Sequence, residues 1–557
     1  MLTVFVAKTI ITMDAGRPRA TAVAVLDGRI VSVGSLASMR PWLDRHPHTV
    51  DDRFSDKVLC PGFVDPHTHF RWSSSLFKLH YVGPIASPNG TEGAVTTREA
   101  VFARLAAVDA AMSDPAEPIF AWGFDPVVHG GHLHRDKLDG ISKTRPISVL
   151  AYAIHFTYAN SAMLALLGAT DEMVMHGLGR YDDGRLNGQF IEFEANHFAM
   201  APFRDSIANR ESIRSGMRLI GRTACASGIT TTGELALGIS DFDAELEDYQ
   251  SVADGPGFPV RVVLIPTAAA MQRRHGDGAA EAAKALSGRS TEKLRFHGIK
   301  LWTDGSYQAL SLRVNFPGFL DGKNGLRGDV PWDELTSFIR PYWEAGVQVH
   351  VHAIGDEALD AALDTLDDLQ NLKPRFDHRL TIEHYSVSNT SQARRLARLG
   401  GCASVNIYLV HYRAEAQSLS GLGPDRAEAT ARLGSLEREG VVFGLHSDYA
   451  LVVVPMRPLV GMWIATRRLG SDGVTVLSPG ECIGLERAMR AVTIDAAFLL
   501  RLENEIGSIE VGKRADFAVL ESDPFECELD ELPAIKVWGT IYAGVAYQAA
   551  DAGAPQG

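Results

Sequence analysis

The chain has 557 residues, of which 54 are basic and 68 acidic, and its formal net charge at pH 7 is −14. This length exceeds a typical single core and predicts one large domain with additions. The acidic balance lacks the basic footprint of a nucleic-acid-binding protein and gives no attraction to an anionic membrane surface, so a small-molecule substrate is expected.

The sequence shows no pattern typical of a signal peptide, a membrane span or a disulfide framework. Residues 1–8 lack the charged region and longer apolar stretch of a signal peptide, and no run of about 18 uninterrupted apolar residues occurs elsewhere. The five cysteines are scattered and form neither a disulfide framework nor a Cys-x-x-Cys site. We expect a cytoplasmic protein that binds neither nucleic acid nor membrane.

The first predicted elements form a β-hairpin. Residues 22–26 and 29–33 are apolar runs separated by the turn dipeptide Asp27-Gly28. Near the other end, the apolar run 517–520 follows a glycine-rich segment, and a further pair of strands surrounds Gly539. Because antiparallel hairpins do not belong in a parallel barrel, we expect residues 1–57 and 490–557 to form one composite β-sandwich.

An apolar run over residues 58–64 predicts a buried strand that leads into the pair His67 and His69. Residues two apart on a strand point to the same side, so both imidazoles could bind one metal ion. Such a pair, taken alone, is as often a polar strand end as a metal site. Partners elsewhere in the chain are therefore needed.

Four later strand-like runs each end in a possible ligand. They span residues 296–300, 347–352, 380–384 and 441–448, and they end in Lys300, His352, His384 and Asp448. Single strand-end histidines are more often satisfied polar groups than ligands, most lysines lie at the surface, and an isolated Asp often caps a strand. The ordered set is more specific than any of its members.

This set resembles the metal-dependent amidohydrolase superfamily, in which strands one, four, five, six and eight of a (β/α)8 TIM-like barrel supply ligands in that order. Residues 299–306 and 351–356 are similar to the YtcJ-like branch, which includes N-substituted formamide deformylases. The run His446-Ser447-Asp448-Tyr449 departs from that branch, which more often has glycine before the Ser-Asp pair. The resemblance spans nearly the whole chain and implies an α/β fold with the barrel over residues 58–489.

The resemblance also constrains the strand count, because Lys300 must lie on the fourth barrel strand. Four apolar runs precede it, over residues 118–122, 147–152, 228–232 and 260–265. We assign the last two to strands two and three, so residues from about 71 to about 209 become an insertion after strand one, where long loops build substrate pockets. Residues 402–407 supply the seventh strand.

The residue types of the predicted ligands indicate their chemistry. Neutral imidazoles suit zinc, although several divalent ions would fit, and an open coordination position lowers the pKa of a bound water from about 15.7 toward roughly 7. We expect one or two ions, with zinc leading. The resemblance implies that Lys300 can be N-carboxylated, which converts a cation into an anionic bridge between metals.

Further residues are candidates for the pocket. His155 follows an apolar run and could bond a substrate carbonyl, although a satisfied core histidine is an equally open interpretation. Trp302 and His446 stand two residues from Lys300 and Asp448, so each shares a face with its ligand and is expected to line the pocket. The cluster of His129, His132 and His134 is interpreted as a solvated insertion loop and not as a second metal site.

These features predict hydrolysis of a non-peptide carbon–nitrogen bond in a small amide-type molecule, led by an N-substituted amide or formamide. Metal-bound hydroxide would attack, and Asp448 would act as general base and then as general acid. One alternative is hydrolysis of a cyclic amide, carbamate or ester at the same site. Another is a metal-free binding or assembly protein on an amidohydrolase scaffold. The resemblance implies a homo-oligomer.

Overall fold

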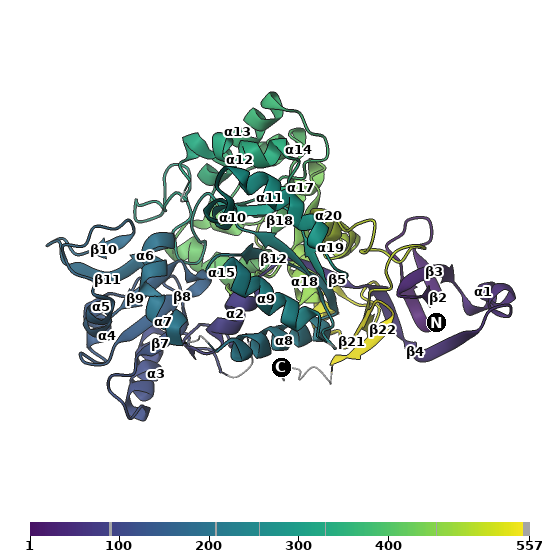
Figure 1. The fold of residues 1–557 in the computed structure, drawn as a ribbon, viewed down its shortest axis with the longest axis horizontal. Helices are drawn as coiled ribbons and strands as arrows, with labels where there is room; N and C mark the ends of the chain where they lie inside the picture. Colours follow the sequence, from purple (N-terminus) through teal and green to yellow (C-terminus); the bar gives the residue numbers. More distant parts are fainter. Residues whose placement is uncertain (89–91, 207–208, 256, 329, 453, 550–557) are drawn as a thin grey trace.

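The computed structural model describes residues 1–88, 92–206, 209–255, 257–328, 330–452 and 454–549. Figure 1 shows a central body of strands and helices, with a sheet inserted early in the chain on the left and a sheet from the two chain ends on the right. Among the described residues, no helix combines the length and the apolar character needed to cross a lipid bilayer.

The central body is built on parallel strands in two hydrogen-bonded sheets. The first sheet contains β5 (Phe63–Thr68), β12 (Ile229–Leu237), β13 (Arg261–Pro266) and β14 (Leu294–Phe296). The second contains β15 (Ile299–Trp302), β16 (Val349–Ala353), β17 (Thr381–His384), β18 (Cys402–Val405) and β19 (Phe443–Leu445). Because β14 and β15 are separated only by His297 and Gly298, which has a φ of +65°, they are two halves of the fourth barrel strand.

Short contacts join the two sheets at both seams. Thr267, just beyond β13, forms a parallel bridge with Lys300. On the other side, the amide of Asp448 donates to the carbonyl of His67 at 3.0 Å, and the amide of His69 donates to Tyr449 at 2.9 Å. This arrangement agrees with the predicted barrel, including the assignment of residues 228–232 and 260–265 to its second and third strands.

Helices cover the outside of the barrel. They are α8 (Arg210–Ala226), α9 (Phe242–Ala253), α10 (Ala268–His275), α11 (Ala279–Leu286), α12 (Leu335–Glu344), α13 (Asp356–Leu372), α14 (Thr390–Arg398), α15 (Tyr408–Ser420), α16 (Pro424–Glu428), α17 (Leu433–Arg438), α18 (Pro458–Arg467), α19 (Leu485–Ala491) and α20 (Ile494–Leu499). In α13 the residues Leu359, Leu363 and Leu366 recur at the helical period and are buried, which fixes the face that packs inward.

The apolar run over residues 58–64 is divided between two strands and is not the single strand that the sequence predicts. Its first part ends β4 (His48–Pro61), in which Leu59 pairs antiparallel with Val519, and its last part begins β5. Gly62 lies between them, and its amide donates to the backbone carbonyl of Asp516 at 2.9 Å. The last four residues of β4 and all of β5 are buried, so apolar character alone could not separate them.

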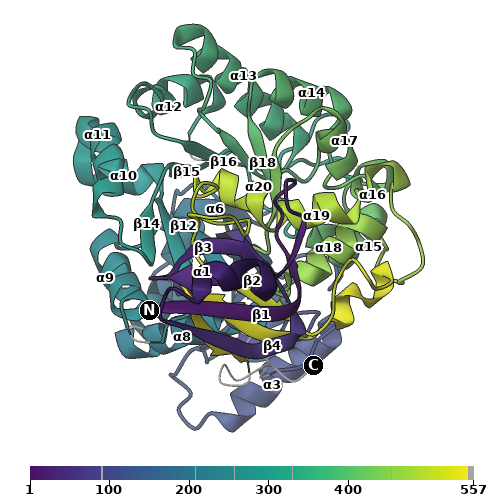
Figure 2. The ribbon, with the colours of Figure 1, turned by 90° about the vertical axis from the view of Figure 1, so that its right-hand side faces the viewer.

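The two chain ends form one composite β unit, as the sequence predicts, and its strands are hydrogen-bonded in one continuous order. Its strand order is β22 (Val545–Gln548), β21 (Val537–Tyr542), β20 (Phe517–Leu520), β4, β1 (Leu2–Ile11), β2 (Arg19–Leu26) and β3 (Arg29–Gly34). Figure 2 shows β1 to β4 of this sheet together with α1 (Leu36–Leu43), the helix that follows β3. The rings of Phe5 and Phe517, on strands from opposite ends of the chain, lie 6.4 Å apart in its core. The expected boundary at residue 490 falls within α19, and Ala496 and Ala497 of α20 pack with Val64 of β5.

The segment that follows strand one forms a sheet of its own. After α2 (Phe70–Leu76), the strand order is β10 (Leu178–Arg180), β11 (Leu186–Ile191), β9 (Phe156–Ala159), β8 (Ile147–Ala151), β7 (Ile119–Phe124) and β6 (His80–Tyr81). Its helices are α3 (Arg98–Ala111), α4 (Arg135–Asp139), α5 (Ser161–Leu167), α6 (Glu192–Ala199) and α7 (Ala201–Ser206). The buried residues Val101, Ile119 and Val149 belong to a separate core cluster, so this unit folds around its own apolar interior.

Candidate metal centre

Five of the proposed site residues meet where β5, β17 and β19 end. They are His67, His69, His384, His446 and Asp448, and each is at most 5% exposed. Asp448 Oδ1 lies 3.2 Å from Nε2 of His69 and 3.7 Å from Nε2 of His67, and its Oδ2 lies 3.7 Å from Nδ1 of His384. Residues separated by more than 300 positions in the sequence therefore form one buried cluster.

Two buried glutamates orient the His67 and His69 rings. Nδ1 of His67 donates to Oε2 of Glu383 at 2.7 Å, and Nδ1 of His69 lies 3.2 Å from Oε1 of Glu234. When a carboxylate accepts a hydrogen bond from Nδ1–H, the lone pair of the neutral ring lies on Nε2. The two Nε2 atoms face each other at 3.3 Å.

This donor set fits a divalent cation. When both rings are neutral, two Nε2 lone pairs and a carboxylate oxygen face one small space, and a cation placed there would satisfy all three. Among the described residues, His67, His69 and Asp448 form one group whose ligand atoms all lie within 4.8 Å of one another, and His67, His384 and His446 form another. Imidazole and carboxylate ligands are those that zinc prefers in proteins.

His352 and Lys300 lie beside this cluster on β16 and β15. The His352 ring is 4.5 Å from the His384 ring, and its Nε2 donates to the carbonyl of Gly305 at 3.1 Å, so His352 is in neither group of closely spaced ligand atoms. Burial lowers the pKa of Lys300 to about 8, while the charges of Glu383 and Asp448 act in the opposite direction. A fraction of this buried amine is therefore neutral near pH 7, as carboxylation requires.

Two residues proposed for the pocket approach His352 from different elements. His155 ends the short helix η1 (Tyr152–Ile154) of the insertion, and its Nδ1 donates to Glu192 at 2.7 Å. Its ring lies 6.0 Å from that of His352, so the insertion reaches the centre. Trp302 on β15 lies 6.5 Å from the His352 ring, and Lys300 Nζ lies 5.5 Å from the Trp302 ring.

The prediction that His129, His132 and His134 lie in a solvated loop is wrong for His129 and His132. His129 is 2% exposed, and its Nε2 donates to the carbonyl of Val95 at 2.8 Å. His132 Nδ1 lies 2.7 Å from the hydroxyl of Tyr158, and its ring stacks on Phe156. The loop packs on the insertion sheet, and in the described part of the chain none of the three belongs to a group that could hold a metal.

Glu234, Glu383 and Glu192 are site residues that the sequence reasoning missed. Glu383 directly precedes His384, and adjacent residues of a regular strand point to opposite faces. His384 has a φ of +74° and Asp448 a φ of +57°, so the backbone leaves the strand conformation at both positions. An acidic residue next to a predicted ligand is the signal that could have been used for Glu383.

The buried charges affect the histidines unequally. Burial lowers the pKa of His69, but its interactions with Asp448 and Glu234 outweigh this effect and raise the pKa to about 9. Burial lowers the pKa of His446 to about 4, so that ring is neutral at pH 7. A proton and a divalent cation therefore compete for the pocket between His69 and Asp448.

Comparisons with known proteins agree with this geometry. A sequence model described as "Amidohydrolase family" matches residues 55–547. The chain is 27% identical to Protein LONG AFTER FAR-RED 3 of Arabidopsis thaliana, with 93% of this chain and 87% of that protein covered. It is 26% identical to N-substituted formamide deformylase of Arthrobacter pascens, with 96% of each chain covered.

Two further relatives support the same placement. The chain is 24% identical to the putative amidohydrolase YtcJ of Bacillus subtilis, with 96% of this chain and 97% of that protein covered. Among solved structures, an uncharacterized metal-dependent hydrolase from Pyrococcus horikoshii matches with a TM-score of 0.70 at 19% identity, with 95% and 99% of the two chains covered. The latter likeness concerns the fold.

Proposed function

Because the chain belongs to the amidohydrolase family and is similar to its YtcJ-like members, we propose that it is a metal-dependent hydrolase of non-peptide carbon–nitrogen bonds in small molecules. Its leading substrate class is an N-substituted amide or formamide, which the name of the Arthrobacter relative supports. Among the described residues, the observation that carries the proposal is the convergence of His67 Nε2, His69 Nε2 and Asp448 Oδ1 within 3.7 Å.

We propose that His67, His69, His384 and Asp448 hold a divalent ion, with His352 and Lys300 completing its surroundings. Such an ion supplies Lewis-acid chemistry and lowers the pKa of water from about 15.7 toward about 7. Glu383 and Glu234 keep the two Nε2 lone pairs directed at the ion by binding the opposite ring nitrogens.

Asp448 moves the proton in this proposal. Its carboxylate takes a proton from the attacking water as the water oxygen bonds to the carbonyl carbon. It then gives that proton to the departing nitrogen, so the carbon–nitrogen bond breaks and an acid and an amine leave. The position of Asp448 beside His69, where burial excludes bulk water, suits one residue to both roles.

His155 is proposed to orient the substrate from the insertion. Glu192 fixes its ring through Nδ1, and the ring lies 6.0 Å from that of His352, which places it to meet a substrate carbonyl oxygen beside the metal ligands. Trp302 and His446 are proposed to bound the pocket. Lys300 is proposed to react as a neutral amine with carbon dioxide, forming a carbamate and releasing one proton.

A substrate panel tests the proposal. Purified protein, stripped of metal and reloaded with zinc, should release amine from N-substituted formamides faster than it hydrolyses cyclic amides, carbamates or esters. The Asp448→Asn variant should lose turnover while the exposed loop variant Asp472→Asn keeps it. Near-normal turnover by Asp448→Asn would contradict its role, and a preference for another bond would replace the substrate class.

Metal analysis distinguishes the proposed enzyme from the alternative of a protein without catalytic activity. A metal-free binding or assembly protein on the same scaffold would contain no stoichiometric zinc, manganese or iron under any preparation. The proposed enzyme should retain at least one ion through gel filtration. A cytoplasmic homo-oligomer remains our expectation for its cellular form.

A further inference from the structure

His446 lies among the metal-ligand candidates because it directly follows strand β19. It follows β19, and its amide continues the ladder by donating to the carbonyl of Val405 at 3.0 Å. Its neighbour Ser447 turns to the other side, where its amide donates to Asp65 at 3.2 Å. His446 and Asp448 therefore project from the same side of the chain toward His67.

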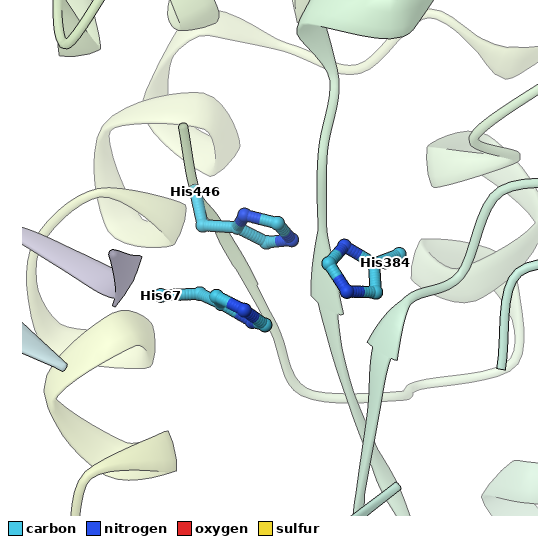
Figure 3. A group of neighbouring side chains, drawn as sticks. All are labelled: His67, His384 and His446. Carbon is cyan, nitrogen blue, oxygen red and sulfur yellow. The ribbon is translucent and has the colours of Figure 1, made fainter. Parts of the chain in front are cut away.

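Three imidazoles surround one small volume in Figure 3, which shows the rings of His67, His384 and His446 facing one another. The His446 ring stacks on that of His67 with centroids 4.7 Å apart and planes 20° apart, and it lies 5.1 Å from the His384 ring at 69°. Each residue offers a ring nitrogen within 4.8 Å of those of the other two.

The nitrogens of His446 lack the partners that a purely structural histidine would have. The residue is 2% exposed, and neither Nδ1 nor Nε2 has a hydrogen-bond partner among the described residues. Leaving a buried polar group unsatisfied is costly, so such groups are rare unless a ligand or ion satisfies them. By contrast, the buried His129 uses both of its ring nitrogens within the protein.

We propose that His446 is a further ligand of the metal centre, which gives the ion an imidazole in addition to those of His67, His69 and His384. This inference rests on the proposed metal-dependent function. A centre richer in imidazole favours zinc, cobalt or nickel over manganese and magnesium, which prefer oxygen ligands. His446 would thereby raise affinity and shape metal preference, while Asp448 handles the proton.

The substitution His446→Phe tests the inference, because phenylalanine keeps a ring to stack on His67 but has no nitrogen. The control is His411→Phe, since His411 packs edge-on against Trp463 outside this cluster. Zinc affinity is measured by competition with a chromophoric chelator, and the coordination of cobalt(II) is followed by its visible absorption bands. Circular dichroism verifies that each variant is folded.

We expect His446→Phe to weaken zinc binding by more than about tenfold and to change the cobalt bands, while His411→Phe matches the unaltered protein. If phenylalanine prevents folding, the smaller His446→Asn variant is measured in the same way with the same expectation. A folded variant with unaltered affinity and unaltered cobalt bands overturns the inference and leaves the proposed function standing. Failure of the unaltered protein to bind zinc or cobalt refutes both.

Discussion

Glu383 fixes the orientation of His67, and replacing it with leucine removes a carboxylate that holds two rings at once. Its Oε2 accepts from Nδ1 of His67 and its Oε1 from Nδ1 of His350, both at 2.7 Å. All three side chains are 1% exposed, so bulk water does not reach these ring nitrogens. Without it, the His67 hydrogen can move to Nε2, where it blocks the lone pair that the metal needs.

The size of the effect follows from the role of such carboxylates. Removing a group that orients a metal-bound histidine typically costs 10- to 100-fold in metal affinity, which is about 1.4 to 2.8 kcal/mol. Glu383→Gln should fall between leucine and the unaltered protein. The glutamine carbonyl can still accept from Nδ1 of His67. Its amide can donate to Nδ1 of His350 if the hydrogen of that ring moves to Nε2. This move breaks no hydrogen bond, because Nε2 of His350 has no partner among the described residues.

Zinc affinity by chelator competition is the assay, and His350→Phe is the control. This variant removes the other partner of Glu383 but leaves the His67 bond, so metal affinity should change by less than about threefold although stability falls. Equal loss of affinity in Glu383→Leu and His350→Phe would mean that packing is responsible. Unaltered affinity in Glu383→Leu would refute the argument that this carboxylate fixes the His67 tautomer.

Three other predictions concern different parts of the molecule. Asp516→Ala should destabilise the protein by about 3 to 5 kcal/mol in urea unfolding, because it removes the carboxylate that lies 2.7 Å from the buried guanidinium of Arg261. An unaltered unfolding midpoint would show that this ion pair does not stabilise the protein. Crystals grown with zinc and bicarbonate should show a carboxylated Lys300, and density for an unmodified amine there would remove that proposal. Burial lowers the pKa of His132 from 6.5 to about 4, so its stabilising contribution is complete above pH 6.5 and is lost as the pH falls toward 4. The thermal midpoint of His132→Phe should therefore fall less steeply than that of the unaltered protein across this window, and parallel curves would contradict the shift.

The ligands could be predicted because parallel strands bring their carboxyl ends to one side of a barrel. His67 and His384 each end an apolar run, so the sequence places them without knowledge of the register. The supporting carboxylates could not be found in this way. Glu383 meets His67 across 316 positions, and the backbone leaves the strand conformation at its neighbour His384, which has a φ of +74°.

Two errors have a common physical origin. The run 58–64 is equally apolar in β4 and β5, so the division at Gly62 depends on the pairing of Leu59 with Val519 from the other end of the chain. The segment around His129 is polar in sequence, yet the amide of Asp125 and the carbonyl of Val95 satisfy its imidazole inside the insertion. Tertiary partners decide both cases, and hydrophobic pattern alone does not reveal them.

Anomalous diffraction from zinc-loaded crystals tests the central claim most directly. The account predicts a zinc peak about 2.0 to 2.1 Å from Nε2 of both His67 and His69, with Asp448 beside it. Crystals that contain stoichiometric zinc but show their anomalous peak away from these imidazoles would contradict the proposed centre.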